Sequence, residues 1–410
     1  MTTISQLIKR SLHNPVRRAY IKRRLSSDAS YEASWQRIDF FDGQNRVIDW
    51  GSVSIEIDHE PGVISQFNSS SLNIIFDNQG GHWNVETDVQ SIWFDDASTY
   101  LNRKFSKLKV ECGYKDEDGT EVGVVDVFEG VIESVRIGEN QKSVVNVLSY
   151  QTILQRYSVS DLSMTGAKTV STIVDLIMNQ SKITDFIPFV AAVPTTDQTI
   201  QDSALLEGTY WEILQNLAYW SNSVIKLVGD TFAFKARTAG VSSVWDFEGI
   251  GTTNPDIFQV LSYEDEGADR VRLFFKAKDQ SESVTSSDTV LLQKYLGEPE
   301  IIDLDNFNSV GRTAILTSLL STWENPKPVI RFSTRFMLNQ LEPLDKINLT
   351  IFGQLLPVDN SFRWDAWTWD DGSVWGQLKG AVNIKRQDFM VTQVNKNIQN
   401  WSTEIKAEKV

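Results

Sequence analysis

The sequence has few of the side chains from which catalytic and metal sites are built. Among its 410 residues there is one cysteine, Cys112, and three widely separated histidines, His13, His59 and His82. A single cysteine cannot form an intrachain disulfide, so packing and assembly must stabilise the fold, and a reducing compartment is the simplest place for it to form. One cysteine and three scattered histidines give no zinc-binding spacing. We therefore expect no metal site and no cofactor.

Motifs of the common enzyme classes are also absent. The sequence contains no HExxH, no GxSxG and no Walker phosphate-binding loop. Carboxylates are plentiful, and a glycosidase or cell-wall hydrolase needs a pair of them. Asp365, Asp370 and Asp371 are the acids that such an activity would use. The abundance of carboxylates alone does not indicate an active site, however, and we expect no catalytic residues and no enzymatic activity.

Long apolar runs are absent as well. No run approaches the roughly 18 residues that indicate a membrane-spanning helix. The first 25 residues are basic, but they lack the apolar stretch and the small-residue cleavage site of a secretion signal, so we expect no signal peptide. With 41% hydrophobic and 23% charged residues, the composition is typical of a soluble chain that forms a core. The length is sufficient for two or three domains.

Acidic residues outnumber basic ones in the chain as a whole, but the N-terminus is basic. The formal net charge is −15, and so acidic a surface repels phosphate, which makes sequence-wide binding of nucleic acid unexpected. Residues 1–34 have the opposite polarity and include Arg17, Arg18, Arg23 and Arg24. Two interpretations stay open: a basic arm that docks on an acidic surface such as a neighbouring subunit, or a frayed, solvated terminus. The first makes these four arginines candidate interface residues.

Residues 35–157 have the pattern of an antiparallel β domain. In 106–114, Leu108, Val110, Cys112 and Tyr114 share one face of an alternating run. The run ends in KDEDGTE, where Asp-Gly at 118–119 predicts a hairpin, because both residues tolerate positive φ. These acids do not have the spacing of an EF-hand calcium loop, so the hairpin is the simpler interpretation.

Residues 158–245 predict a small α+β module. Apolar residues at 170, 173, 174 and 177 lie on one face of a helix near 169–181. A second helix, near 209–222, opens with the capping-box pair Thr209 and Glu212, whose side chains satisfy backbone N–H groups reciprocally. The alternating residues that follow predict a hairpin at 223–236.

Residues 246–410 predict a second β domain, with a helix near 309–323 and a tryptophan-rich hairpin at 362–376. The two β domains end alike, in VFEGVIESVRIGENQKSVVNVLS (127–149) and DFMVTQVNKNIQNWSTEIKAE (388–408). Each is an apolar strand, a polar turn and an alternating strand, so either a diverged internal duplication or a chance similarity of two hairpins accounts for them. The fold class is therefore mainly β, and α+β overall.

The segment FRWDAWTWDDGSVWG (362–376) concentrates large aromatic side chains. An Asp-Gly turn at 371–372 would close a hairpin with aromatic residues on both faces, which its own domain could not bury on both sides. We expect an arm that packs on a neighbouring subunit or another protein of the same assembly, where tryptophan is enriched as an anchor. Packing inside the chain and a sugar-binding platform are the alternatives. The candidate interface residues are Trp364, Trp367, Trp369 and Trp375.

Five segments carry a family resemblance, and they follow one another along most of residues 60–410. They are SLNIIFDNQGGHW (71–83), VFEGVIESV (127–135), SVVNVLSYQTILQR (143–156), TYWEILQNLAYWSNSVIKLVGDTFAFKAR (209–237) and LEPLDKINLT (341–350). The first three resemble consecutive strands, and the fourth resembles the helix-plus-hairpin module, of the hub and distal-tail proteins of tailed bacteriophages. The fifth is similar to the family's leucine–x–Pro–Gly–Asp strand entry, with Leu344 where glycine is usual.

This resemblance implies two tail-tube-like antiparallel β-barrel domains with an inserted α+β module. It implies a structural ring at the tail tip or baseplate of a virion, assembled in the host cytoplasm, with no catalysis. Two barrels per chain would make a trimer match the six-fold tail tube, and one barrel would require a hexamer. The implied partners are neighbouring tail-tube and tip proteins, with DNA only in passage through the channel. A carbohydrate-binding β module that recognises a host surface is the alternative function.

Overall fold

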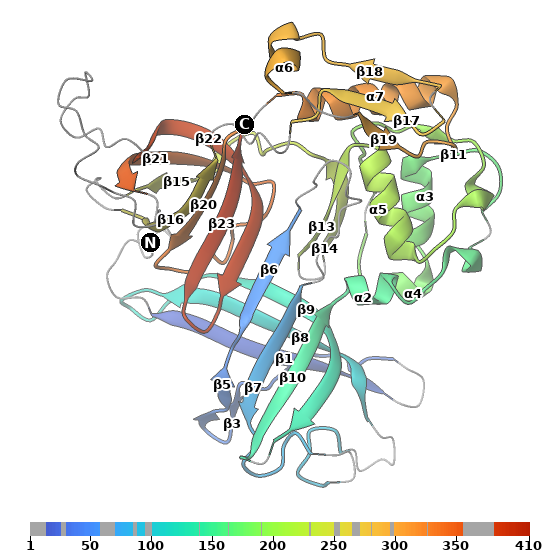
Figure 1. The fold of residues 1–410 in the computed structure, drawn as a ribbon. Helices are drawn as coiled ribbons and strands as arrows, with labels where there is room; N and C mark the ends of the chain where they lie inside the picture. The colour runs from blue at the N-terminus through green and yellow to red at the C-terminus, as the bar shows by residue number, and fades with distance from the viewer. Residues whose placement is uncertain are drawn as a thin grey trace, which may run out of the picture.

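Strands make up most of the regular structure, and they form two large sheets with a helical region beside them (Figure 1). The computed structural model describes residues 14–25, 30–57, 70–84, 88–94, 101–138, 140–162, 164–189, 191–228, 231–249, 255–264, 271–279, 281–295, 299–325, 327–355 and 381–410. The expected mainly β fold is confirmed. Strand pairing among these residues closes neither sheet into a barrel, because each strand order has two ends. The two barrels therefore remain a prediction.

The first sheet has the order β2-β1-β8-β9-β10-β7-β5, and all its pairings are antiparallel. Its strands are β1 (Pro15–Leu25), β2 (Gln36–Arg37), β5 (Val47–Asp49), β7 (Ser71–Asp77), β8 (Leu101–Lys115), β9 (Glu121–Ile137) and β10 (Lys142–Ser149). A short hairpin of β3 (Phe40–Phe41) and β4 (Gln44–Asn45) stands beside it. The alternation in β8 buries Leu108, Val110, Cys112 and Tyr114, as the sequence predicts.

The turn between β8 and β9 is the predicted Asp-Gly hairpin. Gly119 has φ +80°, a conformation that glycine adopts without strain. The Asp116 side chain accepts hydrogen bonds from the backbone N–H groups of Asp118, at 3.1 Å, and Thr120, at 2.9 Å. These bonds fix the turn and with it the register of the two longest strands of the first sheet.

The second sheet has the order β15-β21-β22-β23-β20-β16, and β6 also pairs with β22. Its strands are β15 (Ser243–Glu248), β16 (Ile257–Glu264), β20 (Val329–Thr334), β21 (Lys346–Leu355), β22 (Ala381–Asn397), β23 (Ser402–Lys409) and β6 (Ser52–Glu56). Only β15 and β21 run parallel; the other pairs are antiparallel. Strand β6 comes from the N-terminal region, directly after β5 of the first sheet, so the second sheet includes a strand from the part of the chain that forms the first.

The two sheets repeat one topology. With β2 and β6 set aside, the six strands of each sheet, numbered in chain order, lie in the order 1-4-5-6-3-2. In both sheets, strands 4, 5 and 6 are consecutive antiparallel neighbours. The two sheets differ at the first strand of this numbering, because β1 runs antiparallel to its neighbour β8 and β15 runs parallel to its neighbour β21. This repeat agrees with the internal duplication that the similar ends 127–149 and 388–408 suggest.

In both sheets the outer strands approach each other. In the second sheet, the Asp256 N–H donates to the Glu248 carbonyl at 2.7 Å, which links the start of β16 to the end of β15. In the first sheet, buried Asp39 accepts from Ala19 N–H of β1 at 3.0 Å, and its carbonyl accepts from Arg46 N–H at 2.7 Å. The Arg46 carbonyl in turn accepts from Asp77 of β7. Each sheet is therefore strongly rolled.

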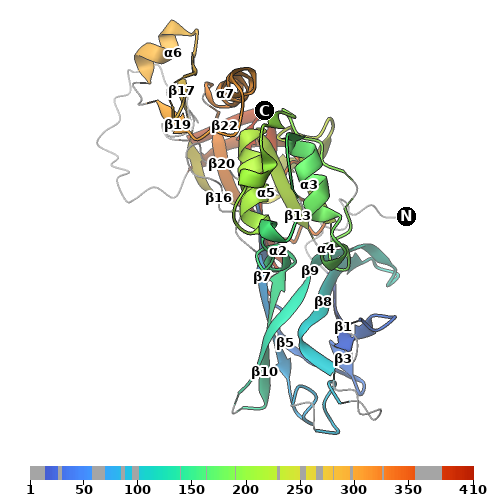
Figure 2. The same ribbon diagram turned by 90° about the vertical axis from the view of Figure 1, so that its right-hand side faces the viewer.

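The helical region forms a second hydrophobic core. Its helices are α2 (Gln151–Leu154), α3 (Val170–Met178), α4 (Ser181–Thr184), α5 (Tyr210–Trp220), α6 (Thr289–Lys294) and α7 (Ser309–Trp323), with 3-10 turns η1 (Val159–Asp161) and η2 (Ser203–Leu205). Its strands are β11 (Lys168–Thr169), β12 (Thr199–Ile200), β13 (Ser223–Val228), β14 (Thr231–Ala236), β17 (Phe274–Ala277), β18 (Ser283–Thr285) and β19 (Glu300–Ile302). Figure 2 shows the helices above the end of the first sheet.

The predicted helices are confirmed, and so is the capping box of α5. Thr209 accepts a hydrogen bond from Glu212 N–H at 3.2 Å, and the Glu212 side chain accepts from Thr209 N–H at 2.7 Å. The predicted 223–236 hairpin corresponds to β13 and β14. Helix α7 packs in the same core as α3 and α5, and it lies against β17 and β18.

Candidate functional site

The four candidate arginines lie on β1, which is a strand of the first sheet rather than an arm. Strand β1 pairs with β8 from Pro15 opposite Tyr114 to Leu25 opposite Leu101. The alternation of Ala19 and Ile21 with more exposed neighbours is the sequence signal for this strand, and the run of basic residues concealed it. Residues 1–13 lie outside the described residues.

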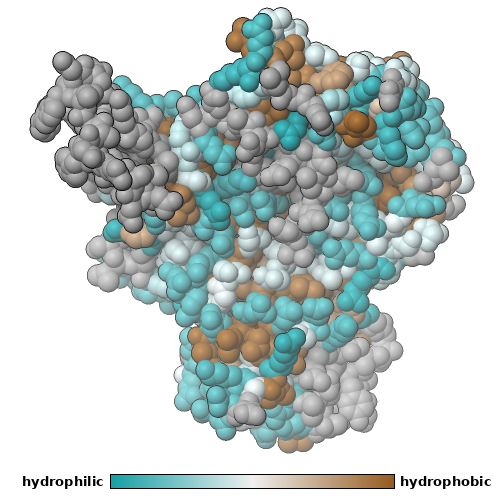
Figure 3. Space-filling view, in the orientation of Figure 1, coloured by the Kyte–Doolittle hydropathy of each residue, from teal (hydrophilic) through white to brown (hydrophobic). Residues whose placement is uncertain are grey.

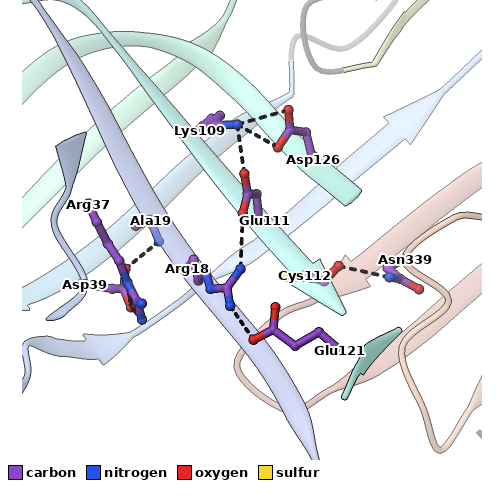
Figure 4. A network of polar contacts seen from close by, with 10 residues as sticks. All are labelled: Arg18, Ala19, Arg37, Asp39, Lys109, Glu111, Cys112, Glu121, Asp126 and Asn339. Carbon is purple, nitrogen blue, oxygen red and sulfur yellow. Dashed lines mark hydrogen bonds and ion pairs between the residues drawn. The ribbon is translucent and has the colours of Figure 1, made fainter. Parts of the chain in front are cut away.

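Arg18 belongs to a charge network on the outer face of the first sheet (Figure 4). Its guanidinium pairs with Glu121 and lies 3.9 Å from Glu111. Lys109 Nζ lies 2.8 Å from the Glu111 carboxylate and 3.2 Å from that of Asp126. Burial opposes the charge of Lys109, but hydrogen bonds and the charges of these two acids raise its pKa above the ordinary value. The network thus balances positive β1 and β8 side chains with acids of the same sheet.

The other three arginines also have partners within the chain. Arg17 lies over the Trp401 ring at 5.0 Å, and its Nη2 donates to the Gln399 carbonyl at 3.3 Å. Arg23 pairs with Glu32. Arg24 lies over an aromatic ring of β8, that of Phe105, at 5.7 Å. A role for these arginines against a neighbouring subunit stays a prediction, and it would have to compete with these contacts.

The tryptophan-rich segment lies outside the described residues. Trp364, Trp367, Trp369 and Trp375 fall in the range 356–380, together with the three acids of the hydrolase alternative. The interface, internal-packing and sugar-binding interpretations of this segment therefore all stay as predictions.

A buried polar junction joins the two sheets, and sequence patterns gave no sign of it. The Asn339 side chain, on the loop after β20, donates to the carbonyl oxygens of Cys112, at 3.0 Å, and Gly123. Figure 4 shows the Cys112 contact reaching β8 from the second sheet. The Tyr114 hydroxyl donates to the Met337 carbonyl. Side chains of one sheet thus satisfy backbone groups of the other, which ties the sheets together.

Lys396 of β22 completes this junction. Its side chain is 1% exposed, and Nζ donates to the Asn339 carbonyl at 2.7 Å. Burial lowers the pKa of Lys396 to about 8, and burial raises the pKa of the Cys112 thiol to about 12. The thiol is therefore protonated at neutral pH and has the properties of a packed core residue, not of a nucleophile.

A groove of about 520 Å³ runs between α5 and β19, and we call it the α5–β19 groove. Figure 3 shows hydrophobic and hydrophilic residues interleaved over this upper right region of the molecule. Its lining comprises Leu206, Glu207, Ile213, Asn216, Tyr219, Trp220, Glu300, Ile301, Ile302, Asp303 and Asn306. The groove is formed by segments nearly a hundred residues apart in sequence, so local patterns could not predict it.

Other reactive groups do not converge. In the part of the chain that the structure describes, no three His, Cys, Asp or Glu side chains are placed to hold a metal ion. His82 packs its ring edge-on against Phe41 at 4.2 Å, while His13 and His59 lie outside the described residues. None of the helices described is long and apolar enough to cross a membrane.

Comparison with known proteins finds similarity in structure but none in sequence. No protein-family model matches the chain, and no curated protein matches its sequence. A tail protein from Neisseria meningitidis is 12% identical with a TM-score of 0.53, over 95% of this chain and 96% of that one. The prophage tail protein gp18 from Listeria monocytogenes is 11% identical with a TM-score of 0.50, over 95% and 94%. The chain therefore has the fold of these two proteins along nearly all of its length.

Proposed function

We propose that the chain is a structural component of the tail tip of a phage or a phage-derived particle. In this role it forms a ring-shaped hub that continues the channel of the tail tube and connects the tube to tip or baseplate proteins. One observation carries the proposal: the fold matches two tail proteins over nearly the whole of each chain. A match of that extent includes both sheets and the helical region, and it agrees with the order of the resembling sequence segments.

Each sheet is proposed to act as one tube-like barrel unit of the ring. The repeated strand order and the approach of the outer strands in each sheet support this. Two units per chain would place six units around an axis in a trimer, which would match a six-fold tube. The trimer is therefore the favoured assembly, and a hexamer is the alternative if only one unit lines the channel.

The proposed role needs neither catalysis nor a cofactor. The net charge of −15 suits a channel through which DNA passes, because an acidic wall does not retain the phosphate backbone. The partners would be neighbouring tail-tube and tip proteins, within the virion and during assembly in the host cytoplasm.

The experiment that tests this function is the mass of the purified full chain, by native mass spectrometry and light scattering across concentration. A closed trimer or hexamer with a central channel in electron micrographs is the expected result. A chain that stays monomeric and also fails to cap purified tail tubes would contradict the hub. Saturable binding of an oligosaccharide by such a monomer would favour the carbohydrate-binding alternative.

A further inference from the structure

The α5–β19 groove combines an apolar floor with an acidic rim. The floor consists of buried residues, namely Leu206, Ile213, Tyr219 and Ile302. The charged lining residues are all acids, namely Glu207, Glu300 and Asp303. Such a lining repels phosphate and other anions, and it complements a segment that is apolar on one side and positively charged on the other.

The rim acids differ in their engagement with the rest of the chain. Glu300 lies 3.6 Å from Arg272, and Asp303 lies 2.7 Å from Lys278. No cation among the described residues pairs with Glu207, which is exposed at the mouth of the groove. A positively charged ligand would therefore find its least screened partner in Glu207.

The first residues of the chain have the complementary chemistry. The sequence MTTISQLIKRSLHN (1–14) contains Lys9 and Arg10, and the first acid of the whole chain is Asp28. Its large aliphatic residues stand at positions 4, 7, 8 and 12. This is the three-and-four spacing by which partner segments place apolar anchors in a groove.

We propose that residues 1–14 of one copy bind in the α5–β19 groove of a second copy. The N-terminal end of β1 lies beside the junction, since Pro15 pairs with Tyr114 and the Tyr114 ring contacts Trp401. Figure 1 shows α5 and β19 on the other side of the molecule from that end of β1. The contact therefore links copies through distant surfaces. It needs neither a channel nor a tail partner, so it is independent of the proposed function.

The test uses the full chain without residues 1–13 and a fluorescein-labelled peptide of residues 1–14. We expect a saturable rise in fluorescence anisotropy, and the affinity should fall as salt increases, because salt screens the attraction of the rim acids.

Glu207→Lys should weaken binding by about tenfold or more. Ile301→Asp, at a groove residue that is 61% exposed, should act similarly without disturbing the core. Glu264→Lys, at an exposed acid on β16, is the matched control and should leave binding unchanged.

Two results would overturn the proposal at different steps. If the peptide does not bind, or binds equally to the Glu207→Lys and Ile301→Asp variants, the groove is not its site. If the peptide binds but deletion of residues 1–13 leaves the number of chains per particle unchanged, the segment occupies the groove of its own chain and not that of a second copy. A third result would contradict the hub function alone. In it, the peptide binds and the deletion reduces the number of chains per particle, but the full chain forms no closed ring.

Discussion

At the scale of single residues, Lys396 is a titratable group buried at the junction between the sheets. An ammonium group that is nearly removed from water is unfavourable unless it is compensated, and its hydrogen-bond partner is a neutral carbonyl, that of Asn339. Burial is the largest cause of its lowered pKa; the charges of Glu342 and Asp345 oppose the shift, and Lys226 adds to it. The junction should therefore respond to pH through one side chain.

We predict that stability rises between pH 8 and about pH 10.4, the ordinary pKa of lysine. In that window the unfolded chain retains a proton that folded Lys396 has released, so the free energy of unfolding increases with pH, by at most about 1.4 kcal/mol per unit. Lys396→Met should remove this slope, whereas Lys385→Met, on an exposed part of β22, should keep it. Urea unfolding at several pH values measures the slopes, and equal slopes for both variants would disprove the lowered pKa.

A second residue-scale prediction concerns the ion pair of Arg237 and Glu408, at 2.8 Å. Both side chains are almost fully buried, and the pair ties the segment after β14 to β23. Glu408→Gln removes the charge of the acid that pairs with a buried guanidinium, so we expect a loss of about 3–5 kcal/mol in the free energy of unfolding. The control is Asp303→Asn, which breaks an exposed pair with Lys278 and should cost about 0–1 kcal/mol. Similar losses in urea unfolding would contradict the assignment.

At the scale of secondary-structure elements, Gly130 explains a feature of the family resemblance. It is the glycine of VFEGVIESV, and it lies in β9 between Leu108 of β8 and Ser149 of β10. A Cβ at this position would clash with the Leu148 carbonyl oxygen. The motif thus requires glycine because the neighbouring backbone approaches too closely for any side chain.

Gly130→Ala should therefore lower the free energy of unfolding by about 1–3 kcal/mol or more, since the central strands must move apart. Gly138→Ala is the matched control, because the nearest atom to its added Cβ is a carbonyl oxygen at 3.5 Å. It should change stability by no more than about 0.5 kcal/mol. Chemical denaturation of both variants compares them, and equal stability would show that β9 tolerates a side chain at residue 130.

The elements that the sequence predicts are those with local signals. The Asp118-Gly119 turn and the Thr209–Glu212 capping box depend on residues within a few positions of each other, and both are present. Strand β1 was hidden because its basic residues suggested an arm. The chain leaves the first sheet after β5 and turns at Gly51, whose φ is +66°, and β6 then pairs with residues more than 300 positions away. No local pattern contains such a pairing.

At the scale of the whole molecule, the two sheets form one body. Residues of both sheets share one hydrophobic core, the chain passes from β5 of the first sheet into β6 of the second, and Asn339 joins the loop after β20 to β8 and β9. A repeated topology alone would allow two independent domains. The shared core and the polar junction instead couple the two sheets.

This coupling gives the last prediction. Asn339→Leu removes the side-chain donor to the buried carbonyl group of Cys112 and the part-buried carbonyl group of Gly123, which should cost about 1–3 kcal/mol. Because the loss falls at the junction, calorimetry should show one thermal transition for the native chain and two separated transitions for the variant. The control is Asn348→Leu, whose amide donates to Asp388 within the second sheet at 2.8 Å. It should lower the melting temperature without splitting the transition, because Asn348 and Asp388 belong to the same sheet. A single transition in Asn339→Leu would mean that β6 and the apolar core suffice to couple the sheets.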